Sequence, residues 1–282
     1  EWRAANMARP RALRLCATRC AAPLAAFEVA ERGPSFLVLV ARLLVLILAA
    51  ARDYNLTQID IRQAYLQAKL HEKLYMRVPP GVPAFDEKGG PLVCRLNRSL
   101  YGLKQAGREW GMLFASFLVS WGFIRSTIDT CLFTYAKSNL LLWILVYVDD
   151  CIIVDNDSAL RSRFVTSLGK RFPVDDRGEL EWMLGVSIRR DRSNNSLSLS
   201  QELFIKDLVD KYASHVTAGH ARKYDTPIEE GLRLSADGCP APNTEAADQM
   251  APRQAIYMAL VGAYGWLSNM TRNEIAHVTS QL

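Results

Sequence analysis

Cysteine is scarce in this sequence, and the few cysteines are scattered. The six at positions 16, 20, 94, 131, 151 and 239 include no CxxC pair, which argues against a zinc ribbon or a dithiol redox motif. Cys16 and Cys20 can be combined on paper with His215 and His220, but their spacing matches no familiar zinc-ligand pattern. We therefore expect buried free thiols in a reducing compartment.

A long uninterrupted apolar run is also missing. The best candidate, residues 36–51, has Arg42 near its middle, whereas a membrane-spanning helix needs about twenty apolar residues without a central charge. The favoured interpretation is a buried helix that leads into the next strand. The alternative, from a different class of function, is a membrane-anchored non-enzymatic protein that uses residues 36–51.

Beyond its first 52 residues the chain has no surplus of either charge. The whole sequence holds 34 Lys and Arg against 29 Asp and Glu, and residues 1–52 contain eight Arg and three Glu. From Asp53 to Leu282 the two counts are therefore equal, at 26 each. Net charge alone does not identify a partner for this region, although a basic groove facing an acidic site is compatible with a neutral total.

Residues 1–35 form an atypical leader to which no domain is assigned. The leader is rich in Arg and Ala, begins without Met and shows no clean periodicity. Its composition is similar to that of a transit peptide, and the flank of an arbitrary fragment is an equally good interpretation.

The apolar periodicity of the remaining chain predicts alternating strands and helices. Half of the 282 residues are apolar, enough for one large domain or two packed subdomains. The pattern predicts a strand over 56–61, a helix over 103–121, a buried hairpin over 140–154 and a helix over 158–172. It further predicts a second hairpin from 180–188 and 196–199, helices after Gln201, a loop over 226–252 and a last helix over 256–270.

Two adjacent acids interrupt the most apolar of these segments. Asp149 and Asp150 stand between apolar runs, and buried charges are costly unless they are paired or bind a metal. An exposed β-turn is the alternative. Since favoured two-residue turns carry Gly or Asn, and this one has neither, the sequence favours a metal site.

A single acidic pair holds divalent ions weakly, so a second strand should bring another carboxylate to the same place. Asp60 is the candidate, because it ends an apolar strand and is followed five residues later by Tyr65. Taken alone, an Asp in this position is most often a helix N-cap.

Six ordered motifs then point to one family. They are IDIRQAYLQAKL, LYMRVPPG, VCRLNRSLYGLKQAGREW, LVYVDD, GELEWMLGVSI and LSLSQELFIKDLV, and they precede YMALVGAYGWLSNMTRNEIAHVTSQL. In this order they resemble the reverse transcriptase of copia-type retrotransposons, from about Arg42 to Leu282. The family carries such a domain within a Pol polyprotein.

The resemblance implies a catalytic centre made of Asp60, Asp149 and Asp150. In the family these acids bind two Mg²⁺ ions, with Mn²⁺ as an alternative. Such a pair of ions activates the primer 3′-hydroxyl and stabilises the departing pyrophosphate.

The resemblance also implies a set of substrate-binding residues. Tyr65 matches the family's aromatic gate against a ribose 2′-hydroxyl, and Gln105 matches a contact to nucleotide and template at a helix start. Gly102 and Lys104 of the same segment, and Tyr147 beside the acids, complete the set. Without the resemblance, Tyr65 is an ordinary core aromatic, and Lys104 and Gln105 are solvated residues at a helix start.

The implied fold is α+β, a polymerase right hand. Residues 36–200 correspond to incomplete fingers and an antiparallel-sheet palm, and residues 201–282 to a helical thumb or connection. The implied function is RNA-directed DNA polymerisation, with a primed RNA or DNA template and deoxynucleoside triphosphates as partners. Ribonuclease H and integrase of the polyprotein are further partners, no membrane is involved, and the location is intracellular, in the cytoplasm, the nucleus or virus-like particles.

Some positions depart from the family pattern. The family has a longer fingers region before the equivalent of Arg42, which residues 1–35 do not match, and Gly107 and Asn273 stand where Pro is common. Leu184 and Gly185 lie in a segment that resembles the family's primer-gripping hairpin, but this match is weaker than the match of the acids to the catalytic motifs. A catalytically inactive, truncated remnant with the same fold is therefore the main alternative.

Overall fold

The computed structural model describes residues 36–216, 240 and 244–282, and its chain divides into two compact units. Unit 1 contains the described residues up to Leu180 together with Asp191–Ser196, and unit 2 contains Glu181–Arg190 and the described residues from Leu197 onward. Both units contain helices and antiparallel strands, which confirms the α+β class. The leader over residues 1–35 lies outside the described residues.

Unit 1 is built on a six-stranded sheet in which every recorded strand pair is antiparallel. The predicted strand and buried hairpin are both confirmed, and the hairpin occupies the middle of the sheet. The strand order is β4 (Ile124–Arg125), β5 (Leu132–Lys137), β6 (Leu140–Tyr147), β7 (Asp150–Asp155), β1 (Asn55–Ile61) and β8 (Val174–Glu179).

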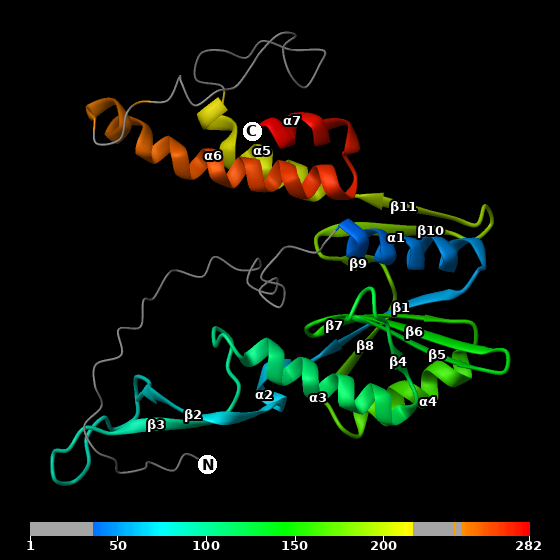
Figure 1. The fold of residues 1–282 in the computed structure, drawn as a ribbon, viewed down its shortest axis with the longest axis horizontal. Helices are drawn as coiled ribbons and strands as arrows, with labels where there is room; N and C mark the ends of the chain where they lie inside the picture. The colour runs from blue at the N-terminus through cyan, green and yellow to red at the C-terminus, as the bar shows by residue number, and fades with distance from the viewer. Residues whose placement is uncertain (1–35, 217–239, 241–243) are drawn as a thin grey trace. The chain divides into compact units, whose positions relative to one another are not determined.

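Helices cover both faces of this sheet, with α3 (Ala106–Trp121) and α4 (Ser158–Gly169) on one face and α1 (Phe36–Ala51) on the other (Figure 1). The two helices predicted over 103–121 and 158–172 are confirmed but shorter. The first begins later because residues 103–105 belong to a turn. The second ends at Gly169, and a turn at Lys170 and Arg171 follows it.

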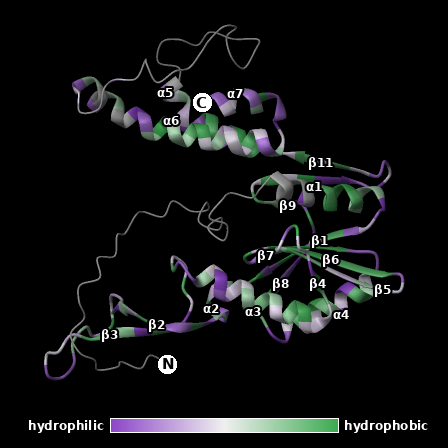
Figure 2. Ribbon diagram, in the orientation of Figure 1, coloured by the Kyte–Doolittle hydropathy of each residue, from purple (hydrophilic) through white to green (hydrophobic). Residues whose placement is uncertain are grey.

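Aromatic rings fill the core between the sheet and α3. Trp110 is buried, stacks on Phe114 with ring centroids 5.1 Å apart, and meets Phe172 edge-on at 5.3 Å. Such aromatic pairs contribute about 0.5–1.5 kcal/mol beyond the burial of their area. The apolar colour of β6 and β7 in Figure 2 agrees with this placement. The core therefore holds the middle of the sheet rigidly.

Helix α1 is confirmed as a helix that packs on one side and leads into β1. Val45 and Ala49 are buried, whereas Leu44 and Ile47 are exposed. None of the helices in the described ranges reaches the length and apolar character that crossing a membrane requires.

An ion pair fixes α1 to the sheet. Nε of Arg42 donates to Asp129 at 3.0 Å, and the two side chains are 16% and 3% exposed. The other oxygen of Asp129 accepts from the backbone N–H of Cys131 at 2.8 Å. The charge that argued against a membrane helix is therefore a buried structural contact.

Replacing Arg42 by Ala should lower the free energy of unfolding by about 3 kcal/mol, because Asp129 would stay buried with its charge unpaired. Urea denaturation followed by circular dichroism measures this change. Replacing both residues by Leu should restore much of the stability. Arg52→Ala, at an exposed residue just past α1, is the matched control, and an equal loss in that variant would refute the role of the ion pair.

The chain between β1 and α3 forms a separate two-stranded sheet, β2 (Lys69–Arg77) paired with β3 (Val93–Arg98). The short helix α2 (Ala64–Gln67) connects β1 to β2. Figure 1 shows this hairpin extending from the body of unit 1. Polar and apolar residues alternate along β2, as expected for a strand with one exposed face.

Unit 2 holds a three-stranded sheet and a group of helices. The sheet has the order β11 (Ser196–Ser200), β10 (Val186–Asp191), β9 (Trp182–Met183). The helices are α5 (Glu202–Val216), α6 (Glu245–Met270), the short 3₁₀ helix η3 (Asn273–Ile275) and α7 (Ala276–Gln281). Gln201 ties the sheet to the end of α6, because its side chain accepts from Thr271 at 2.7 Å.

Two predictions in this unit need correction. The segment 180–188 is not one strand, because Leu184 and Gly185 both have positive φ and form a two-residue turn between β9 and β10. The predicted loop over 226–252 is wrong in its last part, since α6 begins at Glu245. Residues 245–251 are mostly good helix formers, whereas the loop-forming residues concentrate in 226–243, almost all of which lies outside the described residues.

Candidate functional site

Four polar side chains form a row across the central strands of unit 1. In the strand register Tyr147 faces Asp150, Asp150 faces Asp60, and Asp60 faces Asp175. Directly opposed residues of antiparallel strands have Cβ atoms about 4.5–5.5 Å apart and share one face of the sheet. The register therefore brings Asp60 opposite Asp150, the second acid of the pair.

Like charges in such a row repel one another, and each carboxylate has its own polar partner. Asp60 lies 3.0 Å from a guanidinium nitrogen of Arg177, and Asp150 accepts from Gln58 at 3.1 Å. Asp175 lies 3.4 Å from Arg62 at an exposed position. Each acid of the row thus interacts with a cationic or hydrogen-bond-donating side chain. Such contacts are expected where several carboxylates lie close together and a cation could bind.

Asp149 occupies the turn between β6 and β7. Its backbone carbonyl accepts from the N–H of Ile61 at 2.9 Å, which ties the turn to the end of β1. The preceding residue, Val148, has φ of 57°. This conformation is rare for a β-branched residue and costs about 1–3 kcal/mol.

A buried tryptophan holds this strained turn in place. The indole Nε1 of Trp110 donates to the carbonyl of Val148 at 2.7 Å. Because Trp110 is itself fixed by the aromatic core, helix α3 determines where the turn lies. Because the turn has neither Gly nor Asn, Val148 takes the left-handed conformation itself, and the backbone is strained directly beside Asp149.

The electrostatics of the turn show a concentration of negative charge. Burial raises the pKa of Asp149, and the nearby carboxylates of Asp150 and Asp60 raise it further. Burial together with the charge of Asp149 also raises the pKa of Tyr65. Within this cluster, added positive charge would favour ionised Asp149.

Two tyrosines line the approach to Asp149. The rings of Tyr65 and Tyr101 lie 4.6 Å apart, centroid to centroid, with a tilt of 48°. The hydroxyl of Tyr101 is close enough to the Asp149 carboxylate to interact with it. Burial, followed by the charge of Asp149, raises the pKa of Tyr101 to about 12, so this hydroxyl keeps its proton at neutral pH.

The segment after Tyr101 places the remaining candidates near the start of α3. Gly102 has φ of 92°, a left-handed conformation that favours glycine, and a side chain there would meet no atom within 4 Å. Lys104 is exposed in the following turn. Gln105 is the N-cap residue of α3, and its side chain donates to Glu72 of β2 at 2.9 Å.

The donor set of the site fits magnesium. Among the residues that the structure describes, no three His, Cys, Asp or Glu side chains converge closely enough to form a metal-binding group. Mg²⁺ does not need such a group, because it is commonly held by one or two carboxylates together with substrate phosphates and water. The opposed Asp60 and Asp150, with Asp149 in the adjoining turn, meet that lower requirement.

Three cysteines, Cys94, Cys131 and Cys151, lie in the part of the chain that the structure describes, and all three are free thiols. Of the residues combined on paper into a zinc site, only His215 lies within the described ranges. Cys151 is a buried free thiol as expected, whereas the free thiols of Cys94 and Cys131 are only partly buried.

Sequence reasoning missed four neighbours of the acids. Gln58, Tyr101, Asp175 and Arg177 were not among the candidates, although all four interact with or face a proposed catalytic residue. Tyr101 stands beside Gly102 in a motif that had been singled out, so it could have been found there. Asp175 and Arg177 carry no local signal, because only the register of β8 against β1 brings them to Asp60.

Comparison with known proteins gives a consistent result. A family model described as reverse transcriptase (RNA-dependent DNA polymerase) matches residues 33–229. The retrovirus-related Pol polyprotein from transposon TNT 1-94 of Nicotiana tabacum is 35% identical over 83% of this chain and 17% of its own length. The Pol polyprotein from transposon RE1 of Arabidopsis thaliana is 34% identical over 85% of this chain and 15% of its own length. The resemblance to copia-type reverse transcriptases is thereby confirmed.

The chain spans less than a fifth of the length of these curated relatives. Among solved structures, a chain of telomerase from Candida albicans, in complex with a fragment of telomeric RNA, overlaps 68% of this chain and 42% of its own length. At 10% identity and a TM-score of 0.32, that overlap is too weak to support an argument about fold or function.

Proposed function

Because this chain belongs to the reverse transcriptase family, whose model covers residues 33–229, we propose that it is the polymerase domain of a transposon Pol polyprotein. It adds deoxynucleotides to a primer on an RNA or DNA template. The observation that carries the proposal is the alignment of Asp60 with Asp150 across β1 and β7, beside the strained turn that presents Asp149. Ribonuclease H and integrase belong to other parts of the same polyprotein.

The three acids are the proposed catalytic and metal-binding residues. Asp60, Asp149 and Asp150 would hold Mg²⁺, or Mn²⁺, together with the triphosphate of the incoming nucleotide. A bound divalent ion supplies charge neutralisation at the phosphates and acidifies the primer 3′-hydroxyl. The protein contributes preorganisation, since the sheet register and the Trp110 contact fix the acids before substrate arrives.

The tyrosines and the start of α3 are the proposed nucleotide-binding surface. Tyr65 is buried and its ring lies at a tilt against that of Tyr101, a contact that would hold the ring in place to reject a 2′-hydroxyl. Gly102, Lys104 and Gln105 lie between this pair and α3, where a base and a phosphate could be contacted. Tyr147 shares the face of Asp150 and completes the substrate-binding set.

The right-hand architecture extends the proposal to the whole chain. Residues 36–200 would form the fingers remnant and palm, with the six-stranded sheet as the palm floor. Residues 201–282, largely helical where described, would act as the thumb, holding a duplex by its backbone and shape. The turn at Leu184 and Gly185 is the proposed primer-gripping hairpin.

Primer extension on poly(rA) primed with oligo(dT), in Mg²⁺, tests the function. Incorporation of deoxythymidine that stops on addition of EDTA is expected. If no metal, template or primer length gives incorporation, the chain is the inactive remnant that the departures at Gly107 and Asn273 allow.

Replacing Tyr65 by Val should relax sugar discrimination. A smaller side chain leaves room for the 2′-hydroxyl, so we expect incorporation of ribonucleotides to rise at least about tenfold relative to deoxynucleotides, a change of about 1.4 kcal/mol. Single-nucleotide extension with dTTP or UTP measures the ratio. Tyr135→Val, at a half-buried ring in the same unit but away from the acids, is the control, and unchanged rejection of UTP by the Tyr65 variant would remove the gate role.

A further inference from the structure

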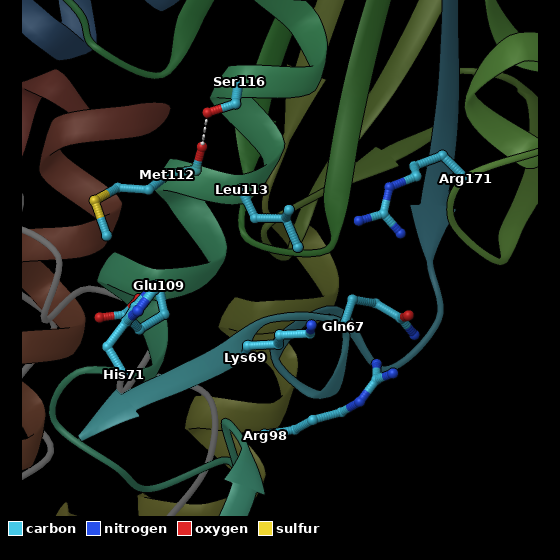
Figure 3. Close-up of a pocket in the computed structure, with 9 residues that line it drawn as sticks. All are labelled: Gln67, Lys69, His71, Arg98, Glu109, Met112, Leu113, Ser116 and Arg171. Atoms are coloured by element: carbon cyan, nitrogen blue, oxygen red, sulfur yellow. Dashed lines mark hydrogen bonds and ion pairs between the residues drawn. The ribbon is translucent and has the colours of Figure 1, made fainter. Parts of the chain in front are cut away.

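A cavity of about 570 Å³ lies in unit 1, separate from the acids. Its walls come from α2, β2, β3, the outer side of α3 and the segment that follows α4 (Figure 3). None of the proposed catalytic or substrate-binding residues lines it. Its volume falls within the range of about 300–1,000 Å³ that is typical of ligand pockets.

Three basic side chains line this cavity from three separate parts of the chain. They are Lys69 on β2, Arg98 on β3 and Arg171 after α4. Within the described part of the chain none of them forms an ion pair. Glu109 is the acid of the lining, and its carboxylate lies 3.4 Å from Nε2 of His71.

Two of the cations are held in position by contacts that leave their charge available. One terminal nitrogen of Arg98 donates to the carbonyl of Leu66 at 3.0 Å. The guanidinium of Arg171 lies 5.1 Å from the ring centroid of Phe172, which is buried in the core. Both guanidinium groups therefore retain N–H donors for a ligand, and Leu113 adds an apolar contact in the wall.

From this arrangement we propose that the cavity binds phosphate groups. The three exposed cations lie around one cavity and form no recorded ion pair, since the acid of the lining, Glu109, lies beside His71 instead, and a bound anion would relieve the repulsion among them. Guanidinium groups favour phosphate because their planar fork can donate two parallel hydrogen bonds to its oxygens. The phosphates belong to a free polyphosphate or to the backbone of a single strand, and these sources share the same chemistry.

The test compares two triple variants with the same loss of charge. The first removes the lining cations as Lys69→Gln, Arg98→Gln and Arg171→Gln. The second variant changes Lys73, Arg95 and Lys170 to Gln. These residues are exposed, lie on the same three segments as the lining cations, and do not line the cavity. All chains, including the reference, carry Asp149→Asn and are kept in EDTA, so the outcome does not depend on polymerase activity.

Two probes are measured on the full chain. Sodium tripolyphosphate is titrated by calorimetry, and a fluorescent (dT)12 strand by anisotropy between 50 and 200 mM salt. We expect the dissociation constant for at least one probe to rise tenfold or more in the lining variant. In the matched variant it should change less than threefold. If the probe is the strand, the slope of log affinity against log salt should also fall by about two, the value for three phosphate contacts on a single strand.

The two arms distinguish the sources of phosphate. Loss of tripolyphosphate binding alone identifies a free polyphosphate, whereas loss of (dT)12 binding identifies a strand backbone. Equal affinities in the two triple variants, for both probes, would overturn the proposal. Circular dichroism checks folding, and the exposed Lys69→Gln change alone, compared with Lys73→Gln, replaces the triple variants if folding is lost.

Discussion

Replacing Asp149 by Asn should reduce primer extension at least about a thousandfold, a loss of about 4 kcal/mol of transition-state stabilisation. Asn has nearly the same shape but no charge, so it cannot balance a divalent ion beside Asp60 and Asp150. The turn itself should survive, because its contact to Ile61 uses the backbone carbonyl of residue 149. Steady-state extension of primed poly(rA) at saturating Mg²⁺ measures the change.

Glu179→Gln is the control for Asp149→Asn. Glu179 is an exposed acid on β8 of the same sheet, opposite Thr57 and away from the acidic row. We expect its replacement to change extension by less than threefold. Extension by Asp149→Asn at the rate of this control would show that the acids are not the catalytic centre.

Replacing Trp110 by Ala should produce the largest loss of stability, about 4–5 kcal/mol. The change empties the centre of the aromatic core, where Trp110 contacts Phe114 and Phe172. It also removes the donor to the Val148 carbonyl. Because a typical domain is stable by only about 5–15 kcal/mol, much of this variant should be unfolded at modest urea concentrations, as circular dichroism can show.

Trp110→Phe separates packing from the hydrogen bond. The ring still fills most of the core, so the free energy of unfolding should fall by only about 1–2 kcal/mol. Activity of the folded protein should nevertheless fall at least about tenfold, since the strained turn loses the contact that fixes Asp149. Trp121→Phe, at a half-buried ring of the same helix, is the control. Full activity in folded Trp110→Phe would show that this hydrogen bond does not position the acid.

The middle of the central sheet could be predicted because its signals are local, whereas the sequence reasoning did not predict β4, β5 or β8. The apolar run over 140–154 broken by two acids, and the apolar strand ending at Asp60, needed only neighbouring residues to be interpreted. The left-handed Val148 was foreseeable as an anomaly, since no Gly or Asn was available for the turn. The contact that holds this strained turn could not be foreseen, because Trp110 is 38 residues away from Val148 in the sequence.

The parts that escaped prediction depend on long-range register or on local turn geometry. Asp175 and Arg177 reach the site only because β8 pairs with β1, and such pairing has no short-range signature. The division of 180–188 into two strands depends on positive φ at Leu184, a conformation that sequence does not favour. The phosphate-binding cavity could not be foreseen either, since its three cations come from positions up to about a hundred residues apart.

The central claim, that the aligned acids form a polymerase centre, is tested most directly by one measurement. The full chain and its Asp149→Asn variant are compared for Mg²⁺-dependent addition of deoxythymidine to oligo(dT) on poly(rA). The account predicts incorporation by the chain and none above background by the variant. Equal incorporation by both, or none by the chain in Mg²⁺ or Mn²⁺, would contradict it.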